Sequence, residues 1–213
     1  MMDFDQARVN MIKQQIRTEN VVDEALLSVL TGNPRDQFVP EAYRELAYAD
    51  MNIPLDDTHS MLSPSLEAII LDALDIQQGE KVLEIGTGCA YLTALLAELS
   101  GDIVTLDSVD HVLPDIRKRL SNVNFQHGDA REGWQDLGGF DVIVLNGSVR
   151  NLPDSLLDQL NPGGRLFAII GDDPIMKATL YTHQNSGALD QTVLLETSAT
   201  RLPNADSPEL FSF

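Results

Sequence analysis

The sequence predicts an α/β protein with a mostly parallel central sheet, helices on both faces and an N-terminal helical cap. Two observations support this. From residue 81 onwards, short apolar runs alternate with segments of helical periodicity, which is typical of parallel sheets. The run Val82–Ile85 is followed at once by Gly86 and Gly88 and then by a helical pattern. A strand, a glycine turn and a helix in this order bring backbone N–H groups against a ligand.

Composition narrows the class of protein. The chain has 213 residues, with 33 acidic against 14 basic residues and a net charge of −19. Such a surface repels phosphate backbones, so we expect no nucleic-acid partner. No apolar run approaches the roughly 20 residues of a membrane span, so we expect no membrane partner. The acidic N-terminus does not resemble a secretory signal, and the single cysteine excludes an internal disulfide, so we expect a cytoplasmic protein.

The first third of the chain reads as a helical cap. Apolar spacing predicts helices over 4–17, 23–30 and 41–46. A polar loop over 56–63 precedes a further helix over 64–74, for which Ser63 is the expected N-cap and Pro64 the first helical residue. We place the domain boundary after residue 78. Residues 1–78 then hold the cap and the loop, and residues 79–213 form one compact unit.

The second unit continues the alternation of strands and helices. The expected strands are 82–85, 103–107, 124–127, 140–146 and 165–170, followed by two possible antiparallel strands over 175–181 and 192–198. Helices are expected over 109–120 and 152–160, and the tail after Leu202 is expected to be mobile.

The glycine turn favours one class of ligand. A dinucleotide fingerprint would need a third glycine where this chain has Tyr91. The small residue is instead Ala90, and Glu84 lies two residues before the first glycine. This pattern resembles motif I of the methyltransferases that use S-adenosylmethionine (SAM), which implies that Glu84, Gly86, Thr87 and Gly88 bind the cofactor. An unrelated Rossmann-like domain with a tight turn is the alternative.

Further polar residues follow the neighbouring strands. Asp107 ends the second strand, 19 residues after Gly88, where a carboxylate can accept hydrogen bonds from both ribose hydroxyls. Ser108 lies beside it. Asp129 and Ala130 are expected near the adenine amino group, although Asp129 could instead form an Asx turn. Asn146 is expected at the cofactor site, with an Asn-Gly turn as the alternative.

Several segments together resemble one family, the protein-L-isoaspartate O-methyltransferases. The similar segments are 35–40, 47–50 with 53–55, 82–96, 128–130 with 133–134, 140–143 and 162–164. The resemblance runs from about residue 8 to residue 170. It implies a Rossmann-like SAM-dependent methyltransferase fold with SAM as cofactor. It also implies methyl transfer to a carboxylate of isoaspartyl residues in damaged proteins, so the expected partner is a peptide or protein carboxylate. The sequence leaves the oligomeric state open.

The chain departs from the family in the loop before the helix at Pro64, which we call the acceptor loop (residues 56–63). The family's active-site serine falls on Leu62, Ser60 stands for its threonine and Ser63 for its glutamine. We therefore expect Ser60, Leu62 and Ser63 at the catalytic position, with Ser60 or Ser63 as the hydrogen-bond donor. Because leucine cannot donate, two alternatives stay open: a methyltransferase for another, small acceptor, or a SAM-binding protein without transferase activity.

We expect no catalytic role for two further residues near these segments, His59 and Cys89. His59 is expected to be a solvated loop histidine rather than a catalytic base. Cys89 is expected to pack inside the turn beside the cofactor. No His/Cys cluster has the spacing of metal ligands, so the sequence predicts no metal.

Overall fold

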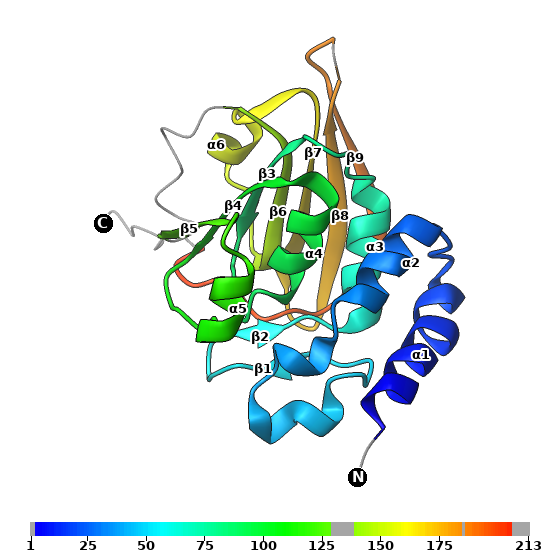
Figure 1. The fold of residues 1–213 in the computed structure, drawn as a ribbon. Coiled ribbons are helices and arrows are strands. Elements are labelled where there is room, and N and C mark those ends of the chain that lie inside the picture. Colours follow the sequence, from blue (N-terminus) through cyan, green and yellow to red (C-terminus); the bar gives the residue numbers. More distant parts are fainter. Residues whose placement is uncertain (1–2, 129–138, 185, 206–213) are drawn as a thin grey trace.

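The computed structural model describes residues 3–128, 139–184 and 186–205. Within these ranges the centre of the molecule is a seven-stranded sheet in the order β5-β4-β3-β6-β7-β8-β9 (Figure 1). Its strands are β3 (Lys81–Ile85), β4 (Asp102–Asp107), β5 (Asn124–His127), β6 (Phe140–Val149), β7 (Leu160–Asp172), β8 (Ile175–His183) and β9 (Leu189–Thr197). The helices are α1 (Phe4–Gln14), α2 (Glu24–Gly32), α3 (Pro64–Leu74), α4 (Tyr91–Ser100), α5 (Pro114–Arg119) and α6 (Asp154–Leu157).

Strand pairing confirms the predicted sheet. Strand β3 pairs in parallel with β4 and β6, β4 with β5, and β6 with β7. The last two strands, β8 and β9, are antiparallel, as their sequence suggested. Since the parallel strands all end at the same edge, the polar residues that follow β3, β4 and β6 meet there.

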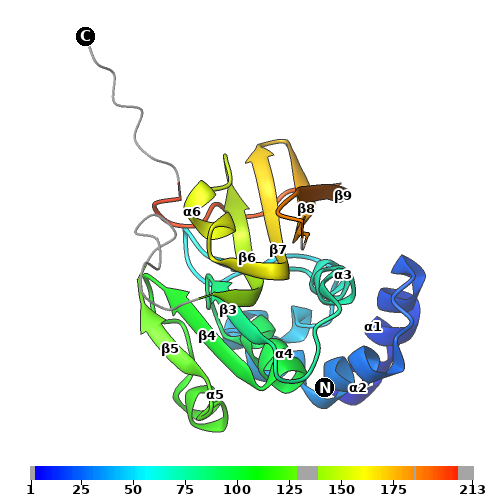
Figure 2. The same cartoon turned by 90° about the horizontal axis from the view of Figure 1, so that it is seen from above.

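Helices cover both faces of the sheet, as predicted. Side chains of β3 alternate, so that Val82 belongs to the apolar cluster under α3 and α4, while Leu83 belongs to the cluster under α6. Figure 2 shows α6 on the opposite side of the sheet from these two helices. The structure is therefore a three-layer α/β fold of the Rossmann-like type.

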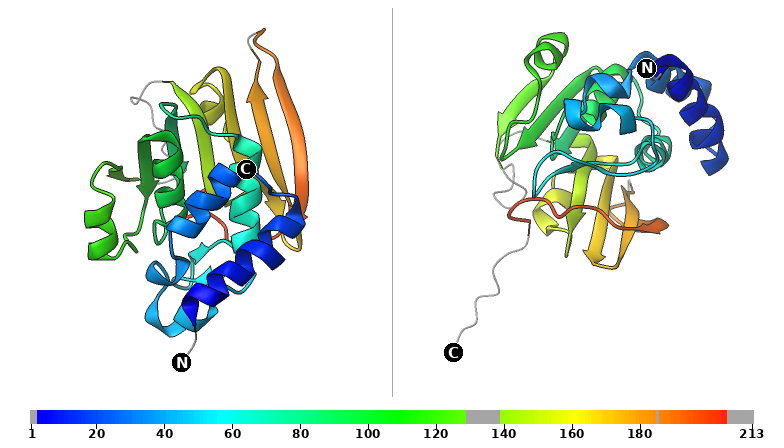
Figure 3. Two further views of the ribbon diagram at one scale, coloured as in Figure 1. Left: turned by 45° about the vertical axis from the view of Figure 1, so that its right-hand side comes forward. Right: turned by 90° about the horizontal axis from the view of Figure 1, so that it is seen from below.

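The N-terminal helices pack outside α3, as the left view of Figure 3 shows. Three 3₁₀ helices, Ile16–Glu19, Arg35–Gln37 and Glu41–Leu46, and a small antiparallel ladder of β1 (Ile53–Pro54) with β2 (Ser60–Met61) connect them to it. One apolar cluster runs from Met11 through α3 and α4 to Ala199. The domain boundary after residue 78 crosses this cluster and stays a prediction.

The start of α3 follows the predicted capping. Ser63 has an extended backbone and its hydroxyl accepts a hydrogen bond from the Leu66 N–H at 3.4 Å, while Pro64 occupies the first turn. This cap fixes the point at which the acceptor loop enters the helix.

Three predicted helices are shorter than expected. The helix predicted over 4–17 ends at Gln14 and is followed by the 3₁₀ helix Ile16–Glu19. The helix predicted over 109–120 begins only at Pro114, because the residue before a proline avoids helical backbone angles and Leu113 has ψ 141°. The helix predicted over 152–160 is reduced to α6, since Pro153 again sets its start and Leu160 already pairs with Phe140 as part of β7. The errors in α5 and α6 arise because the apolar spacing was interpreted without regard to the nearby prolines.

Among the described residues, no helix combines the length and apolar character needed to cross a bilayer.

A buried ion pair ties the helical cap to α3 and contacts the sheet unit at α4. Arg35 is fully buried and donates hydrogen bonds to Glu67 of α3 and to the backbone carbonyl of Leu62. Its guanidinium carbon also lies 4.9 Å from the ring centroid of Tyr91 at the start of α4. Burial raises the pKa of Glu67 to about 7, against the lowering effect of the Arg35 charge and hydrogen bond.

Arg35→Ala is expected to lower the free energy of unfolding by about 3–5 kcal/mol, because it leaves Glu67 buried without its partner. Urea denaturation at pH 7 measures this. Arg17→Ala is the control, since its contact with Glu24 is exposed, and we expect a loss below about 1 kcal/mol. Equal losses in the two variants would contradict the role given to the buried pair.

Candidate functional site

The glycine turn after β3 depends on backbone conformations that favour glycine. Gly86 and Gly88 have φ 96° and 52°. A Cβ on Gly86 would lie 2.8 Å from a methyl of Leu202 and 3.1 Å from the Asn146 carbonyl oxygen. Ala90, where the resembling motif has glycine, also adopts a left-handed conformation with φ 65°. The turn is thus closely packed against the end of β6 and against the segment near Leu202.

Asp107 links the glycine turn to the end of β4. Its carboxylate accepts a hydrogen bond from the Gly88 N–H at 2.8 Å and another from the Val109 N–H at 3.2 Å. The side chain of Asp107 is only 7% exposed, and the exposed part faces the surrounding pockets. Asp107 therefore lies where the spacing from Gly88 predicted.

Glu84 lies behind the turn and is fully buried. One carboxyl oxygen accepts hydrogen bonds from the hydroxyls of Thr93 at 2.5 Å and Thr105 at 2.6 Å. Burial raises the pKa of Glu84 to about 8, against the lowering effect of these two hydrogen bonds. This environment therefore favours the neutral, protonated form of Glu84.

Asn146 connects Glu84 to the turn. Its amide nitrogen donates to the Gly86 carbonyl at 2.9 Å and lies 3.5 Å from the second carboxyl oxygen of Glu84. Within the described part of the chain, its amide oxygen is buried without a hydrogen-bond partner. Because buried polar atoms are normally hydrogen-bonded, the unpaired amide oxygen of Asn146 indicates a place where a ligand donates a hydrogen bond.

Three pockets meet at Asp107. A central pocket is lined by Gly86, Gly88, Asn146 and much of the acceptor loop. A second pocket lies toward β5, and Thr87 lines it. A third is lined by Ser108, Gly128 and Leu202. The predicted cofactor residues Gly86, Thr87, Gly88, Asp107, Ser108 and Asn146 are thus brought together around one carboxylate, and Glu84 lies behind them.

The acceptor loop contributes two of its three predicted catalytic residues to the central pocket. Ser60 lines it, and its hydroxyl shares a hydrogen bond of 2.7 Å with the hydroxyl of Thr200. Leu62 also lines it, although its side chain is 1% exposed and packs in the apolar core. Ser63 is not among the lining residues, because its hydroxyl caps α3.

The expectation of a solvated His59 is wrong. The residue is 8% exposed and lies between two carboxylates, with Nδ1 2.9 Å from Asp56 and Nε2 3.6 Å from Asp107. These contacts draw the ring into the central pocket. Cys89 is buried as expected, and burial raises the pKa of its thiol to about 12.

Sequence reasoning missed the segment after β9. Residues 200–203 line the central pocket, and Ser148 at the end of β6 holds them through hydrogen bonds of 2.9 Å with Thr200 and Leu202. The right view of Figure 3 shows this segment crossing the strand ends beside the acceptor loop. The pair Leu202-Pro203 was the local signal for this segment.

Asp129 and Ala130, predicted near the adenine, lie outside the described residues, as do Gly133 and Trp134.

Comparisons with known proteins agree with one another. A family model described as protein-L-isoaspartate(D-aspartate) O-methyltransferase matches residues 6–202, which is further than the resemblance seen in the sequence. The protein-L-isoaspartate O-methyltransferase of Syntrophus aciditrophicus is 37% identical over 177 residues, or 80% of this chain and 81% of that protein. A protein of the same description from Archaeoglobus fulgidus is 35% identical and covers 80% of this chain and 82% of its own.

A solved structure extends the likeness to the fold. It is a Plasmodium falciparum protein described as a protein-L-isoaspartate O-methyltransferase in complex with S-adenosyl-L-homocysteine. The two chains superpose with a TM-score of 0.76 at 19% identity, over 95% of this chain and 99% of the other.

The buried Glu84 should impose a pH dependence on stability. The unfolded chain releases this proton near pH 4.5, whereas the folded chain keeps it until about pH 8. The contribution of Glu84 to the free energy of unfolding is therefore fully present below the lower pH and is lost as the pH rises through the upper one. The loss amounts to on the order of a few kcal/mol. Glu84→Gln should flatten the fall in unfolding free energy between pH 5 and pH 9.

The exposed Glu45→Gln is the control and should leave the slope of stability against pH unchanged. Parallel slopes for Glu84→Gln and the original chain, measured by denaturant titration at each pH, would show that Glu84 titrates normally.

Proposed function

This chain belongs to the protein-L-isoaspartate O-methyltransferase family, and we propose that it methylates the carboxylate of isoaspartyl residues in damaged proteins. SAM is the methyl donor used in this family. The observation that carries the proposal is the central pocket, where the acceptor loop meets the glycine turn and Asp107.

The residues around Asp107 suit the chemistry of SAM. The side chain of Asp107 offers an acceptor for vicinal ribose hydroxyls. The unpaired amide oxygen of Asn146, with Glu84 behind it, suits an ammonium group. A cation there would also favour the ionised form of Glu84. We propose these roles together with those of Gly86, Thr87, Gly88 and Ser108, while a cofactor contact by Asp129 or Ala130 stays a prediction.

The proposed reaction needs little acid–base help from the protein. When bound, SAM supplies a methyl group already activated by its sulfonium. A carboxylate acceptor has an ordinary pKa near 4 and is ionised at neutral pH, so no general base is required. What remains for the chain is to orient the acceptor and exclude water, and positioning of this kind contributes roughly 7–11 kcal/mol.

The paired hydroxyls of Ser60 and Thr200 are the donors that we assign to the acceptor. Two hydroxyls carry two protons, and their mutual hydrogen bond of 2.7 Å uses only one. The other is free to be donated to a carboxylate oxygen in the central pocket. This pair offers a donor close to Leu62, which has none of its own.

The acceptor loop is held from behind, which suits a positioning role. Arg35 binds the carbonyl of Leu62 and is itself fixed by Glu67 of α3. Leu62 thereby keeps its apolar side chain in the pocket wall. We propose that it shapes the space for the acceptor, while Ser63 supports the loop as the cap of α3.

Peptides or proteins with an isoaspartyl carboxylate are the proposed partners, and the cytoplasm is the proposed location. The location is supported by the single, buried and unpaired Cys89, as expected of a chain that lives in a reducing compartment.

The assay that tests the function uses SAM labelled in its methyl group and a peptide with one isoaspartyl residue. Label should enter the peptide and be released as methanol in base, because a methyl ester is base-labile. The same peptide with ordinary aspartate is the control and should stay unlabelled. Labelling of only another, small acceptor would replace the proposal with that alternative, and binding of SAM without labelling of any lysate fraction would indicate loss of transferase activity.

Ser60→Ala should lower kcat/KM for the isoaspartyl peptide about 5- to 150-fold, the equivalent of one lost neutral donor of roughly 1–3 kcal/mol. Ser28→Ala on the exposed side of α2 is the matched control. An unchanged kcat/KM in Ser60→Ala would remove this hydroxyl from the proposed site.

Asp107→Ala should weaken SAM binding by about 1–3 kcal/mol, because hydrogen bonds to a charged acceptor are lost. Isothermal calorimetry measures the affinity. Asp102→Ala, at the exposed opposite end of the same strand, provides the comparison and should bind SAM as before. If the two variants bind equally well, Asp107 does not contact the ribose.

A further inference from the structure

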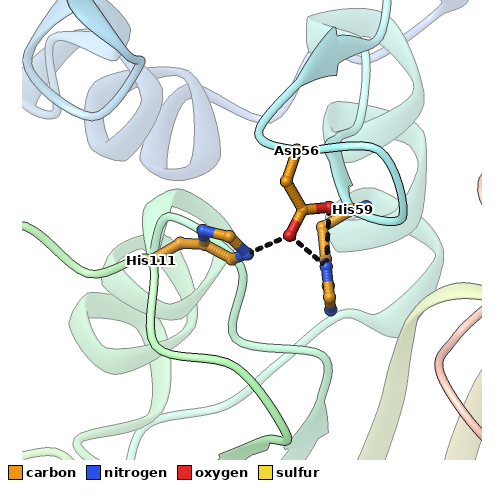
Figure 4. Close-up of side chains that lie close together, drawn as sticks. All are labelled: Asp56, His59 and His111. Atoms are coloured by element: carbon orange, nitrogen blue, oxygen red, sulfur yellow. Dashed lines mark hydrogen bonds and ion pairs between the residues drawn. The ribbon is translucent and has the colours of Figure 1, made fainter.

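Two histidines converge on one carboxylate oxygen at the edge of the central pocket. Asp56 and His59 belong to the acceptor loop, and His111 lies between β4 and α5 (Figure 4). Oδ2 of Asp56 lies 2.9 Å from Nδ1 of His59 and 3.0 Å from Nε2 of His111. The three ligand-type atoms all lie within 4.8 Å of one another.

We propose that Asp56, His59 and His111 bind a divalent transition-metal ion of the zinc type. Zinc takes imidazole nitrogens and carboxylate oxygens at about 2.0–2.2 Å, which places the donors of one tetrahedral ion about 3.3–3.6 Å apart. The spacings of 2.9 and 3.0 Å from the Asp56 oxygen are somewhat shorter, so the ligand atoms would move apart slightly to hold the ion. Two imidazoles and one carboxylate also suit zinc better than magnesium or calcium, which prefer oxygen ligands.

The surroundings orient two of the three ligands. Oδ1 of Asp56 accepts hydrogen bonds of 2.6 Å from the N–H groups of Thr58 and His59 and also lies 3.0 Å from Nδ1 of His59, while Oδ2 lies near both histidines. The far nitrogen of His59 lies 3.6 Å from Asp107. A carboxylate behind a histidine is the usual arrangement at metal sites, because it fixes the ring and raises its basicity.

The contact of His111 favours an ion over a simple hydrogen bond. Its Nε2 is 3.0 Å from Asp56, yet within the described residues this buried nitrogen has no hydrogen-bond partner of acceptable geometry. Nε2 of His111 is near the Asp56 oxygen but does not direct an N–H at it. Two ligand atoms of the same metal ion have this arrangement. The local charge agrees, since the Asp56 carboxylate lies between the histidines and the Asp107 carboxylate lies beside His59.

An ion here would join the acceptor loop to the segment that follows β4. Strand β4 ends in Asp107, and the segment after it lines the second pocket. The site would then fix the loop at the edge of the central pocket, which His59 lines. The proposal departs from the sequence-based prediction of no metal, which rested on local spacing and did not anticipate a ligand 52 residues beyond His59.

Zinc binding to the full chain, freed of metal by a chelator, tests the proposal. The zinc titration competes with a chromogenic chelator and contains excess magnesium to occupy exposed acidic groups. We expect one zinc ion per chain. His111→Ala and Asp56→Asn should each weaken binding at least about tenfold. His183→Ala on β8 is the matched control and should leave the affinity unchanged.

Cobalt provides a second measurement that does not depend on affinity. The visible absorption of cobalt bound to the original chain should report nitrogen and oxygen ligands at low coordination number, and His111→Ala should abolish it. Zinc affinity unaffected by both substitutions, or weakened equally by His183→Ala, would overturn the proposal. Neither measurement uses methyl transfer, so their failure would leave the proposed function untouched.

Discussion

The hydrogen bond from the Gly88 N–H to Asp107 joins the ends of two neighbouring parallel strands. Strands β3 and β4 are in register along their whole length, with Ile85 opposite Leu106, so the glycine turn and the carboxylate reach the same edge together. The Gly86 N–H of the turn also donates a hydrogen bond to the Leu106 carbonyl. All three pockets border on Asp107, and each would change shape if this connection were lost.

The acceptor side of the site is assembled from segments that are distant in the chain. Arg35 holds the loop from the helical cap, Thr200 meets it from the segment after β9, and Asp107 lies beside His59 from the sheet. Two of these contacts, those of Arg35 and Asp107, involve side chains with little access to water, where hydrogen bonds are stronger and unpaired groups cost more. The loop thus owes its conformation to its surroundings as well as to its own residues.

Local pattern was sufficient to predict the elements that local pattern controls. The strands at the centre, the cap of α3 and the position of Asp107 all follow from periodicity, capping chemistry or a fixed spacing. The starts of α5 and α6 could have been predicted from Pro114 and Pro153, whose effect on the preceding residue was overlooked.

Long-range contacts were beyond the reach of the sequence. The burial of His59 depends on Asp107 at the end of β4 as well as on Asp56 of its own loop, and only the contact with Asp56 is local in the chain. The approach of His111 to the acceptor loop and the return of Thr200 to Ser60 are likewise long-range. Such pairings are set by the topology of the sheet, and a single sequence does not reveal them.

The return of residues 200–203 across the strand ends has a consequence for biosynthesis. Because these residues form part of the central pocket and leave the ribosome after every strand of the sheet, a nascent chain can complete its sheet before it can complete its pocket. The wall that carries Thr200 closes only when residues 200–203 have emerged from the exit tunnel. Competence to hold a ligand in this pocket is therefore acquired later than the pairing of the strands.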